Sequence, residues 1–185
     1  MDKYAREVAL GILAEKGLFD PGHHRLIEGI AATAVLSKNG TILDPAGALF
    51  TLPVPLLFAH NWLMPIGRVT RARVTPAGLQ FTAQVANFKL AWLPQIWDGL
   101  KAGSIPAVSA GASGRTRAEI RWNWDELSVL EVGANPQALI TCVKEVYQAD
   151  VVFLDGRKRR ETIHRDIRNN VARGVPIPTR ARASM

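Results

Sequence analysis

The chain has 185 residues, 48% of them hydrophobic and 21% charged, which is the composition of a folded domain with its own core. No apolar run is long enough to cross a bilayer, and the single cysteine, Cys142, excludes an internal disulfide. Of the net charge of +7, residues 155–185 carry +6 (nine Lys and Arg against three Asp and Glu), which argues against a nucleic-acid-binding core in the first 154 residues.

An amphipathic helix is predicted over residues 2–16, where Gly17 is a plausible stop. Its apolar residues recur at helical spacing: Tyr4, Val8, Ile12 and Leu13. The interleaved charges exclude a secretory signal. A turn follows, in which His23 and His24 are expected to be exposed. Residues 1–24 are therefore expected to form an N-terminal helical segment.

Short strands and turns dominate the next stretch of the chain. We expect a helix over residues 88–103, which starts or kinks at Pro94, and a hairpin around the TPAG turn. The expected strands are residues 25–37, 66–75, 79–85, a short one through Ser109, 116–124, 126–132 and 140–154. This pattern predicts an α+β fold over residues 25–154, a mostly antiparallel, closed or nearly closed β-barrel with surrounding helices.

The composition changes after residue 154. Ile163, Ile167 and Val171 recur every four residues, which predicts a basic helix with a narrow apolar stripe. Gly174 and the PIP sequence would end it, and the remaining residues are expected to be disordered. Residues 155–185 are therefore expected to be a basic C-terminal helix and a disordered tail.

Three residues far apart in the sequence are candidates for nucleophilic catalysis. A run of prolines and large apolar residues over 52–69 leads to His60 and would hold its imidazole at the lip of a core. Ser109 lies among small residues that let a substrate backbone approach, and Glu126 opens an alternating segment. A serine nucleophile needs a neighbouring base, and that base needs an acceptor to orient it.

Other interpretations of these residues stay open, because each alone more often has a structural role.

The N–H groups of Ala110 and Gly111 are candidate oxyanion donors. Neither a cofactor nor a metal site is expected. Further candidates for the reactive groups are Ser104, Ser113, Ser128, His164, Asp125 and Glu119.

Three ordered blocks follow one family pattern. Residues 52–85 are similar to an LP-L-x-x-H-x-x-x-P-I-G block with a hairpin, residues 96–112 to a helix and a G-x-S-x-G-F strand, and residues 125–140 to E-x-S-L-V-x-x-P-A-N-P-x-A. Together they resemble the HK97-like phage prohead (procapsid) maturation proteases, serine peptidases related in fold to the herpesvirus assemblin proteases. The resemblance covers about residues 26–142.

The resemblance implies a serine endopeptidase with an assemblin-like fold, in which Ser109, His60 and Glu126 form the triad, with Asp125 as the alternative third member. It implies cleavage of scaffold protein or of the scaffold-like arm of the major capsid protein, and of the chain's own ends. The expected location is the assembling procapsid in the host cytoplasm. A homodimer or higher oligomer is expected, with no membrane partner and no nucleic-acid contact except through the basic tail.

Three positions depart from the family pattern. Ala112 replaces an aromatic residue, Gly133 a proline, and Glu131 a small or apolar residue. The loss of the aromatic residue supports an alternative, in which the chain is a catalytically inactive capsid-assembly or scaffold-like binding module of the same fold. A nucleic-acid-associated protein is a further alternative, suggested by the calculated pI of about 10.1.

Overall fold

The computed structural model describes residues 3–15, 17–87, 90–114, 121–152 and 158–169, the last 12 of these and 149–152 by their backbone only. The elements are α1 (Lys3–Ala14), β1 (His23–Ala32), η1 (Pro45–Gly47), β2 (Ala48–Leu49), β3 (Val54–Phe58), β4 (Asn61–Thr75), β5 (Gly78–Val85), α2 (Leu93–Ala102), β6 (Ala107–Ser113), β7 (Trp122–Leu130), β8 (Ile140–Val152) and β9 (Lys158–Asn169). Of the helices described, none has the length and apolar character that a bilayer crossing requires.

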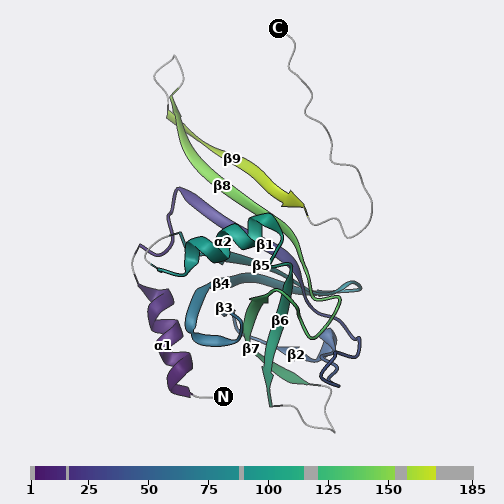
Figure 1. Cartoon of the computed structure of the whole chain (residues 1–185). Helices are drawn as coiled ribbons and strands as arrows, with labels where there is room; N and C mark the ends of the chain where they lie inside the picture. Colours follow the sequence, from purple (N-terminus) through teal and green to yellow (C-terminus); the bar gives the residue numbers. More distant parts are fainter. Residues whose placement is uncertain (1–2, 16, 88–89, 115–120, 153–157, 170–185) are drawn as a thin grey trace.

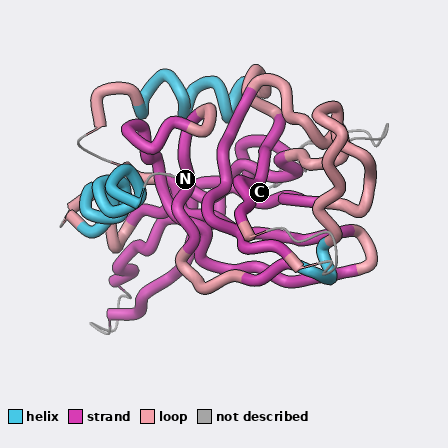
Figure 2. Tube along the Cα trace, turned by 90° about the horizontal axis from the view of Figure 1, so that it is seen from below, coloured by secondary structure: helices cyan, strands magenta, loops and turns pink. Residues whose placement is uncertain are grey.

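The strands form one mixed sheet in the order β2-β7-β3-β4-β5-β1-β8-β9, with β6 on the other edge of β7 (Figure 1). The short β2 and β3 both pair with β7 in parallel, whereas the remaining ladders are antiparallel. The α+β class that the sequence predicts is therefore confirmed. The two helices lie at the periphery of the strands, as Figure 2 shows.

The sheet is not closed into a barrel, and this corrects the expected closed or nearly closed barrel. Closure would require β6 to pair along β8, but β9 pairs with that edge of β8 from Cys142 to Val152. The contact of β6 with the segment before β8 is limited to an isolated bridge between Ala107 and Leu139 and adjoining backbone bonds. A strand has only two edges, so β9 leaves β6 little of β8 to pair with.

The helix α2 covers the core, and the residues at its two ends explain where it begins and ends. Pro94 lies in its first turn, where a missing N–H costs nothing, and Gly103 ends it with a left-handed φ of 84°. This agrees with the predicted start at Pro94. Its core-facing side is buried: Leu93, Ile96, Trp97 and Leu100. Each such side chain contributes roughly 1.5–3 kcal/mol to folding through burial.

Most of the predicted strands agree with the structure. The hairpin around the TPAG turn is confirmed as β4 and β5, and α1 agrees with the helix predicted over 2–16. Where the structure describes them, the two strands expected over 116–124 and 126–132 form a single strand, β7. The predicted turn at His23 and His24 is wrong, because both residues begin β1 and are partly buried.

The predicted C-terminal helix is wrong for residues 158–169, which form β9. A repeat of four residues places Ile163 and Ile167 on one side of a helix, but four is also an even number and fits a strand. Pairing with β8 decides between the two. The disorder expected for about the last ten residues falls within 170–185, which lie outside the described residues.

Candidate active site

His60 is held in a tight turn between β3 and β4. Phe58 pairs with Asn61, so Ala59 and His60 form a two-residue hairpin loop, with φ angles of 50° and 59°. Positive φ at both positions is the type I′ geometry that usually requires Asn or Gly. A left-handed conformation costs a side-chain-bearing residue roughly 1–2 kcal/mol. The turn therefore needs support from elsewhere in the fold.

That support comes from β7, which pairs with β3 in parallel. The N–H of Ala59 donates to the carbonyl oxygen of Val129 at 3.2 Å. The N–H of His60 donates to Oγ of Ser128 at 2.9 Å. Because both central N–H groups of the turn are bound by β7, the main chain at His60 is fixed relative to that strand.

The imidazole of His60 is also bound by β7. Its Nδ1 lies 2.6 Å from Oε1 of Glu126, whose side chain is 4% exposed, whereas that of His60 is 47% exposed. The other carboxylate oxygen accepts a hydrogen bond from the hydroxyl of Ser128 at 2.8 Å. An ionised carboxylate can only accept, so Nδ1 carries a proton, and in the neutral imidazole Nε2 then has a free lone pair.

The pKa of His60 is raised above its ordinary value of 6.5. The hydrogen bond to Glu126 is the largest cause, partial burial opposes it, and the negative charge of Glu126 adds to it. A histidine of this kind is a stronger base than a free imidazole. It therefore takes up a proton at a higher pH than a free imidazole does.

A β-bulge in β7 separates Glu126 from its acidic neighbour. Gly111 of β6 lies opposite Glu126 and Ala112 lies opposite Trp124, so Asp125 is the extra residue. Asp125 lines a different hollow, of about 750 Å³, with Arg6 and other residues. Of the two carboxylates that the sequence left as alternatives, Glu126 is the one in contact with His60.

Ser109 lies on β6, directly opposite Ser128 of β7. Directly opposed residues of an antiparallel pair point to the same face, with Cβ atoms about 4.5–5.5 Å apart. Glu126 and Ser128 share that face, because they are two residues apart on one strand. Among the described residues, however, no hydrogen bond joins Ser109 to His60.

The small residues after Ser109 have two different environments. A Cβ at Gly111 would overlap Oε1 of Glu126, so only glycine leaves room for the carboxylate in this position. The N–H of Val108 donates to Ala138, away from β7, and the N–H of Ala110 points to that same edge by strand alternation. Gly111 points its N–H towards β7 instead. Of the two predicted oxyanion donors, only the N–H of Ala110 points away from β7.

The remaining candidates lie elsewhere. Ser104 is exposed and donates to the carbonyl of Gly99 at 3.3 Å. Ser113 lines the same hollow as Asp125. Ser128 is completely buried, with both of its hydrogen bonds directed at the site. Glu119 and the side chain of His164 lie outside the described residues.

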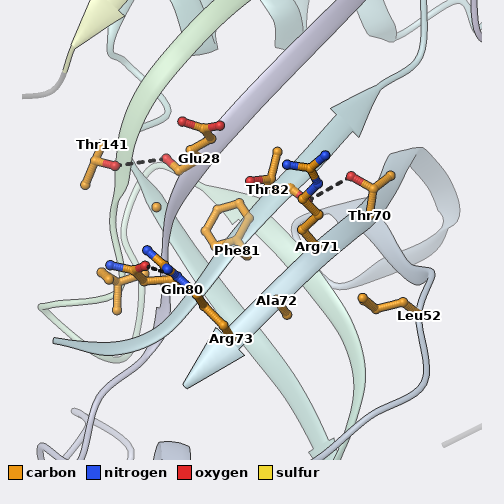
Figure 3. Close-up of a pocket in the computed structure, with 12 residues that line it drawn as sticks. Glu28, Leu52, Thr70, Arg71, Ala72, Arg73, Gln80, Phe81, Thr82 and Thr141 are labelled. Atoms are coloured by element: carbon orange, nitrogen blue, oxygen red, sulfur yellow. Dashed lines mark hydrogen bonds between the residues drawn. The ribbon is translucent and has the colours of Figure 1, made fainter. Parts of the chain in front are cut away.

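Two further features of the surface lie away from His60. A hollow of about 710 Å³ on the outer face of β1, β4 and β5 is lined by Arg71, Arg73, Thr82 and other residues (Figure 3). A smaller one, of about 210 Å³, lies beside α2. Among the side chains that the structure describes, no group of three or more His, Cys, Asp or Glu is placed to hold a metal ion.

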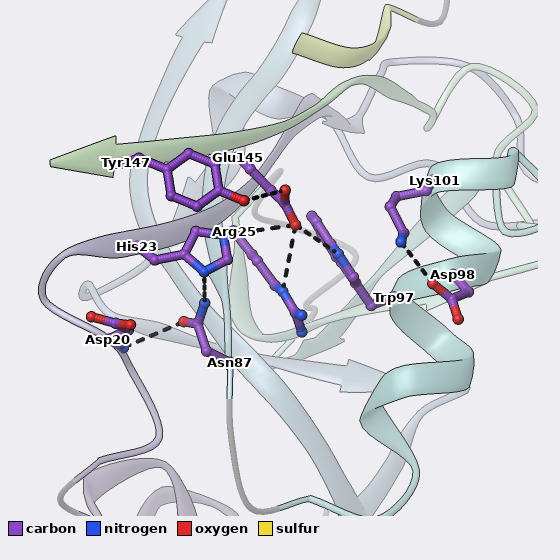
Figure 4. Close-up of polar contacts among 9 residues, drawn as sticks. All are labelled: Asp20, His23, Arg25, Asn87, Trp97, Asp98, Lys101, Glu145 and Tyr147. Carbon is purple, nitrogen blue, oxygen red and sulfur yellow. Dashed lines mark hydrogen bonds and ion pairs between the residues drawn. The ribbon is translucent and has the colours of Figure 1, made fainter. Parts of the chain in front are cut away.

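Next to this smaller hollow lies a polar network that we call the α2 cluster: His23, Arg25, Trp97, Glu145 and Tyr147 (Figure 4). Glu145 accepts hydrogen bonds from the hydroxyl of Tyr147 at 2.7 Å and from the indole of Trp97 at 3.3 Å. Arg25 lies 5.1 Å above the Trp97 ring, and His23 stacks on Tyr147. These contacts attach α2 to β1 and β8.

Two residues of the site have roles that sequence reasoning misses. The sequence presents Ser128 only as a candidate reactive group, and Gly111 only as a candidate oxyanion donor. The pattern Glu126-x-Ser128 does contain a signal, because alternate residues of a strand lie on one face. What the pattern does not contain is the partner of Ser128, since His60 comes from 68 residues away.

Comparison with known proteins finds a related phage protein. The chain is 34% identical over 152 residues to the capsid polyprotein of Pseudomonas phage PAJU2, a match that covers 75% of this chain and 22% of the polyprotein. The chain thus spans about a fifth of the length of that relative. No family model matches the sequence.

Two solved structures of Kaposi's sarcoma herpesvirus protease are also similar over much of the chain. The complex with a hexapeptide phosphonate inhibitor matches with a TM-score of 0.46 and 14% identity, over 69% of this chain and 66% of that one. The complex with an allosteric inhibitor matches with a TM-score of 0.44 and 12% identity, over 63% and 75% of the two chains.

Proposed function

We propose that this chain is a serine endopeptidase of phage capsid maturation, with Ser109 as nucleophile, His60 as general base and Glu126 as the group that orients His60. The observation that carries the proposal is the 2.6 Å contact between Nδ1 of His60 and the buried carboxylate of Glu126. It holds the imidazole in the tautomer whose Nε2 can accept a proton. Ser109 lies on the adjacent strand, on the same face of the sheet.

In the proposed mechanism, the hydroxyl of Ser109 attacks a peptide carbonyl while Nε2 of His60 takes up the hydroxyl proton. His60 then gives this proton to the leaving amine, and water hydrolyses the acyl-enzyme by the same route in reverse. The negative charge of the Glu126 carboxylate stabilises the imidazolium. The N–H of Ala110 points away from β7 and is the better placed of the two proposed oxyanion donors.

The similarity to a phage capsid polyprotein supports a place for this activity within the capsid. We propose that the activity takes place in the procapsid as it assembles in the host cytoplasm. The proposed substrates are scaffold protein or the scaffold-like arm of the major capsid protein, and the chain's own ends. A polyprotein is a plausible context for self-cleavage, because a protease domain joined to capsid segments has its substrates on the same chain. We propose a homodimer or higher oligomer as the working form.

The test is covalent labelling of the full chain by a fluorophosphonate probe, followed by peptide mapping, together with cleavage of a peptide from the capsid arm. Wild type is expected to be labelled at Ser109, and Ser109→Ala to lose labelling and at least about 10⁴-fold in cleavage rate. Ser113→Ala, on the same strand but beside the Asp125 hollow, is the matched control. Near-normal cleavage by Ser109→Ala would rule out the assignment.

A non-catalytic capsid-assembly module with the same fold is the second candidate. It is favoured by one observation: Ala112 stands where the resembled family has an aromatic residue. The lack of a hydrogen bond between Ser109 and His60 in the described residues is compatible with either candidate, because catalytic hydrogen bonds often tighten only when substrate binds. A chain that binds the capsid arm, but that neither cleaves it nor is labelled, would favour this module.

A further inference from the structure

Ser128 is the only residue in the described stretches of the chain that binds both the carboxylate of Glu126 and the main chain of His60. Its side chain has no exposed surface. It accepts from the N–H of His60 at 2.9 Å and donates to Oε2 of Glu126 at 2.8 Å. A hydroxyl has one proton, and a backbone N–H can only donate, so the direction of both bonds is determined.

This arrangement gives the His60 turn and the Glu126 carboxylate a second connection, in addition to the direct contact between Nδ1 of His60 and Oε1 of Glu126. The turn at Ala59 and His60 adopts positive φ angles that neither residue favours. The Glu126 carboxylate could rotate about its last side-chain bond, which has a broad energy minimum. Binding of its second oxygen by Ser128 removes that freedom. The hydroxyl thereby fixes both the main chain that carries the imidazole and the orientation of the Glu126 carboxylate that binds it.

We infer that Ser128 is a positioning residue, whose hydroxyl joins the Glu126 carboxylate to the His60 turn and holds the imidazole in the orientation that proton transfer requires. Its effect on turnover rests on the proposed function, whereas its effect on the His60 ring does not. Because Ser128 is completely buried and its hydroxyl is occupied, it touches no substrate. It acts only through Glu126 and His60.

The first measurement is the state of the His60 imidazole by NMR, assigned with His60→Gln and made in a Ser109→Ala background so that it is independent of activity. In Ser128→Ala we expect the low-field signal of the Nδ1 proton to be lost to solvent exchange, and the His60 pKa to fall towards that of free imidazole. Ser128→Thr keeps the hydroxyl and is expected to restore both. An unchanged signal and pKa in folded Ser128→Ala would overturn the inference.

The second measurement is the kinetics of cleavage of the capsid-arm peptide. Ser128→Ala is expected to lower kcat roughly ten- to a hundredfold, the loss typical of removing an outer partner of a functional histidine, with KM nearly unchanged. If Ser128→Ala does not fold, Ser128→Cys has a similar size and only a weak donor, and is expected to show the same changes to a smaller extent. A change in KM alone would contradict a positioning role.

The matched control is Thr33→Val. Thr33 is also buried, and its hydroxyl is bonded to Asn135, with Oγ1 3.0 Å from Nδ2, rather than to His60 or Glu126. This variant measures the effect of losing a buried hydroxyl alone, and it is expected to leave the His60 signal and kcat unchanged. If wild type neither cleaves nor is labelled, the proposed function fails, but the NMR comparison still decides the role of Ser128.

Discussion

The site cluster (His60, Glu126 and Ser128) and the α2 cluster contain the same kinds of side chain, a histidine, a glutamate and a hydroxyl. In the site cluster the imidazole makes one short bond to the carboxylate and keeps its other nitrogen available, and its side chain is 47% exposed. In the α2 cluster His23 Nε2 lies 3.7 Å from Glu145, and the ring is stacked on Tyr147, with 4.3 Å between ring centroids.

The two carboxylates also differ in what they hold. Glu126 binds groups of one short turn and of its own strand, so it acts on the orientation of His60. Glu145 is shared among Tyr147, Trp97 and Arg25, so it joins α2 to the sheet. The same residue types therefore serve chemistry in one place and packing in the other. The geometry of the two clusters makes this difference. Making the same substitution in each cluster tests it.

The largest expected difference is between Glu126→Gln and Glu145→Gln in cleavage of the capsid-arm peptide. Glu126→Gln is expected to lower kcat/KM by on the order of 10⁴, because an amide no longer selects the useful tautomer of His60. The acid limb of its pH profile should move to lower pH, since the contact with Glu126 is what raises the His60 pKa. Glu145→Gln should leave both kcat/KM and the limb unchanged, and equal losses in the two variants would contradict the comparison.

A smaller effect is expected from Gly111→Ala, because the added methyl group would push against the Glu126 carboxylate. A displacement of about 1 Å is expected to lower kcat/KM up to roughly a hundredfold. The control is Gly11→Ala in α1, where a Cβ meets nothing within 4 Å. That change should leave cleavage intact and raise stability by about 0.5–1 kcal/mol. Full activity in Gly111→Ala would show that the carboxylate position is not critical.

The smallest expected effect is a pH-dependent loss of stability at the α2 cluster. Burial alone would raise the pKa of Glu145, but the hydrogen bond from Tyr147, the charge of His23, the indole of Trp97 and Arg25 together lower it. A lowered pKa stabilises the fold above the ordinary value of 4.5, and this contribution is lost as the pH falls through the folded-state pKa. Chemical denaturation should therefore show wild type about 1–3 kcal/mol more stable than Glu145→Gln at pH 7.

In acid that stability difference should shrink. The difference in free energy of unfolding between wild type and Glu145→Gln could instead stay constant from pH 7 to pH 3. In that case the Glu145 side chain would stabilise the fold through packing rather than through its charge. The stability contributed by the site cluster should depend on pH in the opposite direction. The raised pKa of His60 stabilises the fold below its ordinary value of 6.5, and this contribution is lost as the pH rises through the folded-state pKa.

Local chemistry made several elements of the fold predictable. Pro94 and Gly103 mark the ends of α2, and the alternating segment after the TPAG turn is β5. The same local rules failed for residues 158–169. An apolar repeat of four suits either a helix or a strand, and only the free edge of β8 decides for the strand. Barrel closure failed for the same reason, because edge occupancy is not encoded in any one segment.

The sequence by itself determined the α+β class, most strands, the ends of α2 and which residues deserved attention as a site, because these depend on periodicity, turn chemistry and residue type within short stretches. Only the tertiary structure decided that Glu126 rather than Asp125 contacts His60, that Ser128 joins the two, and that Gly111 makes room for the carboxylate. Those outcomes depend on a bulge in β7 and on the parallel pairing of β3 with β7, which bring together residues more than sixty positions apart. Contacts over such a separation are set by packing of the whole sheet.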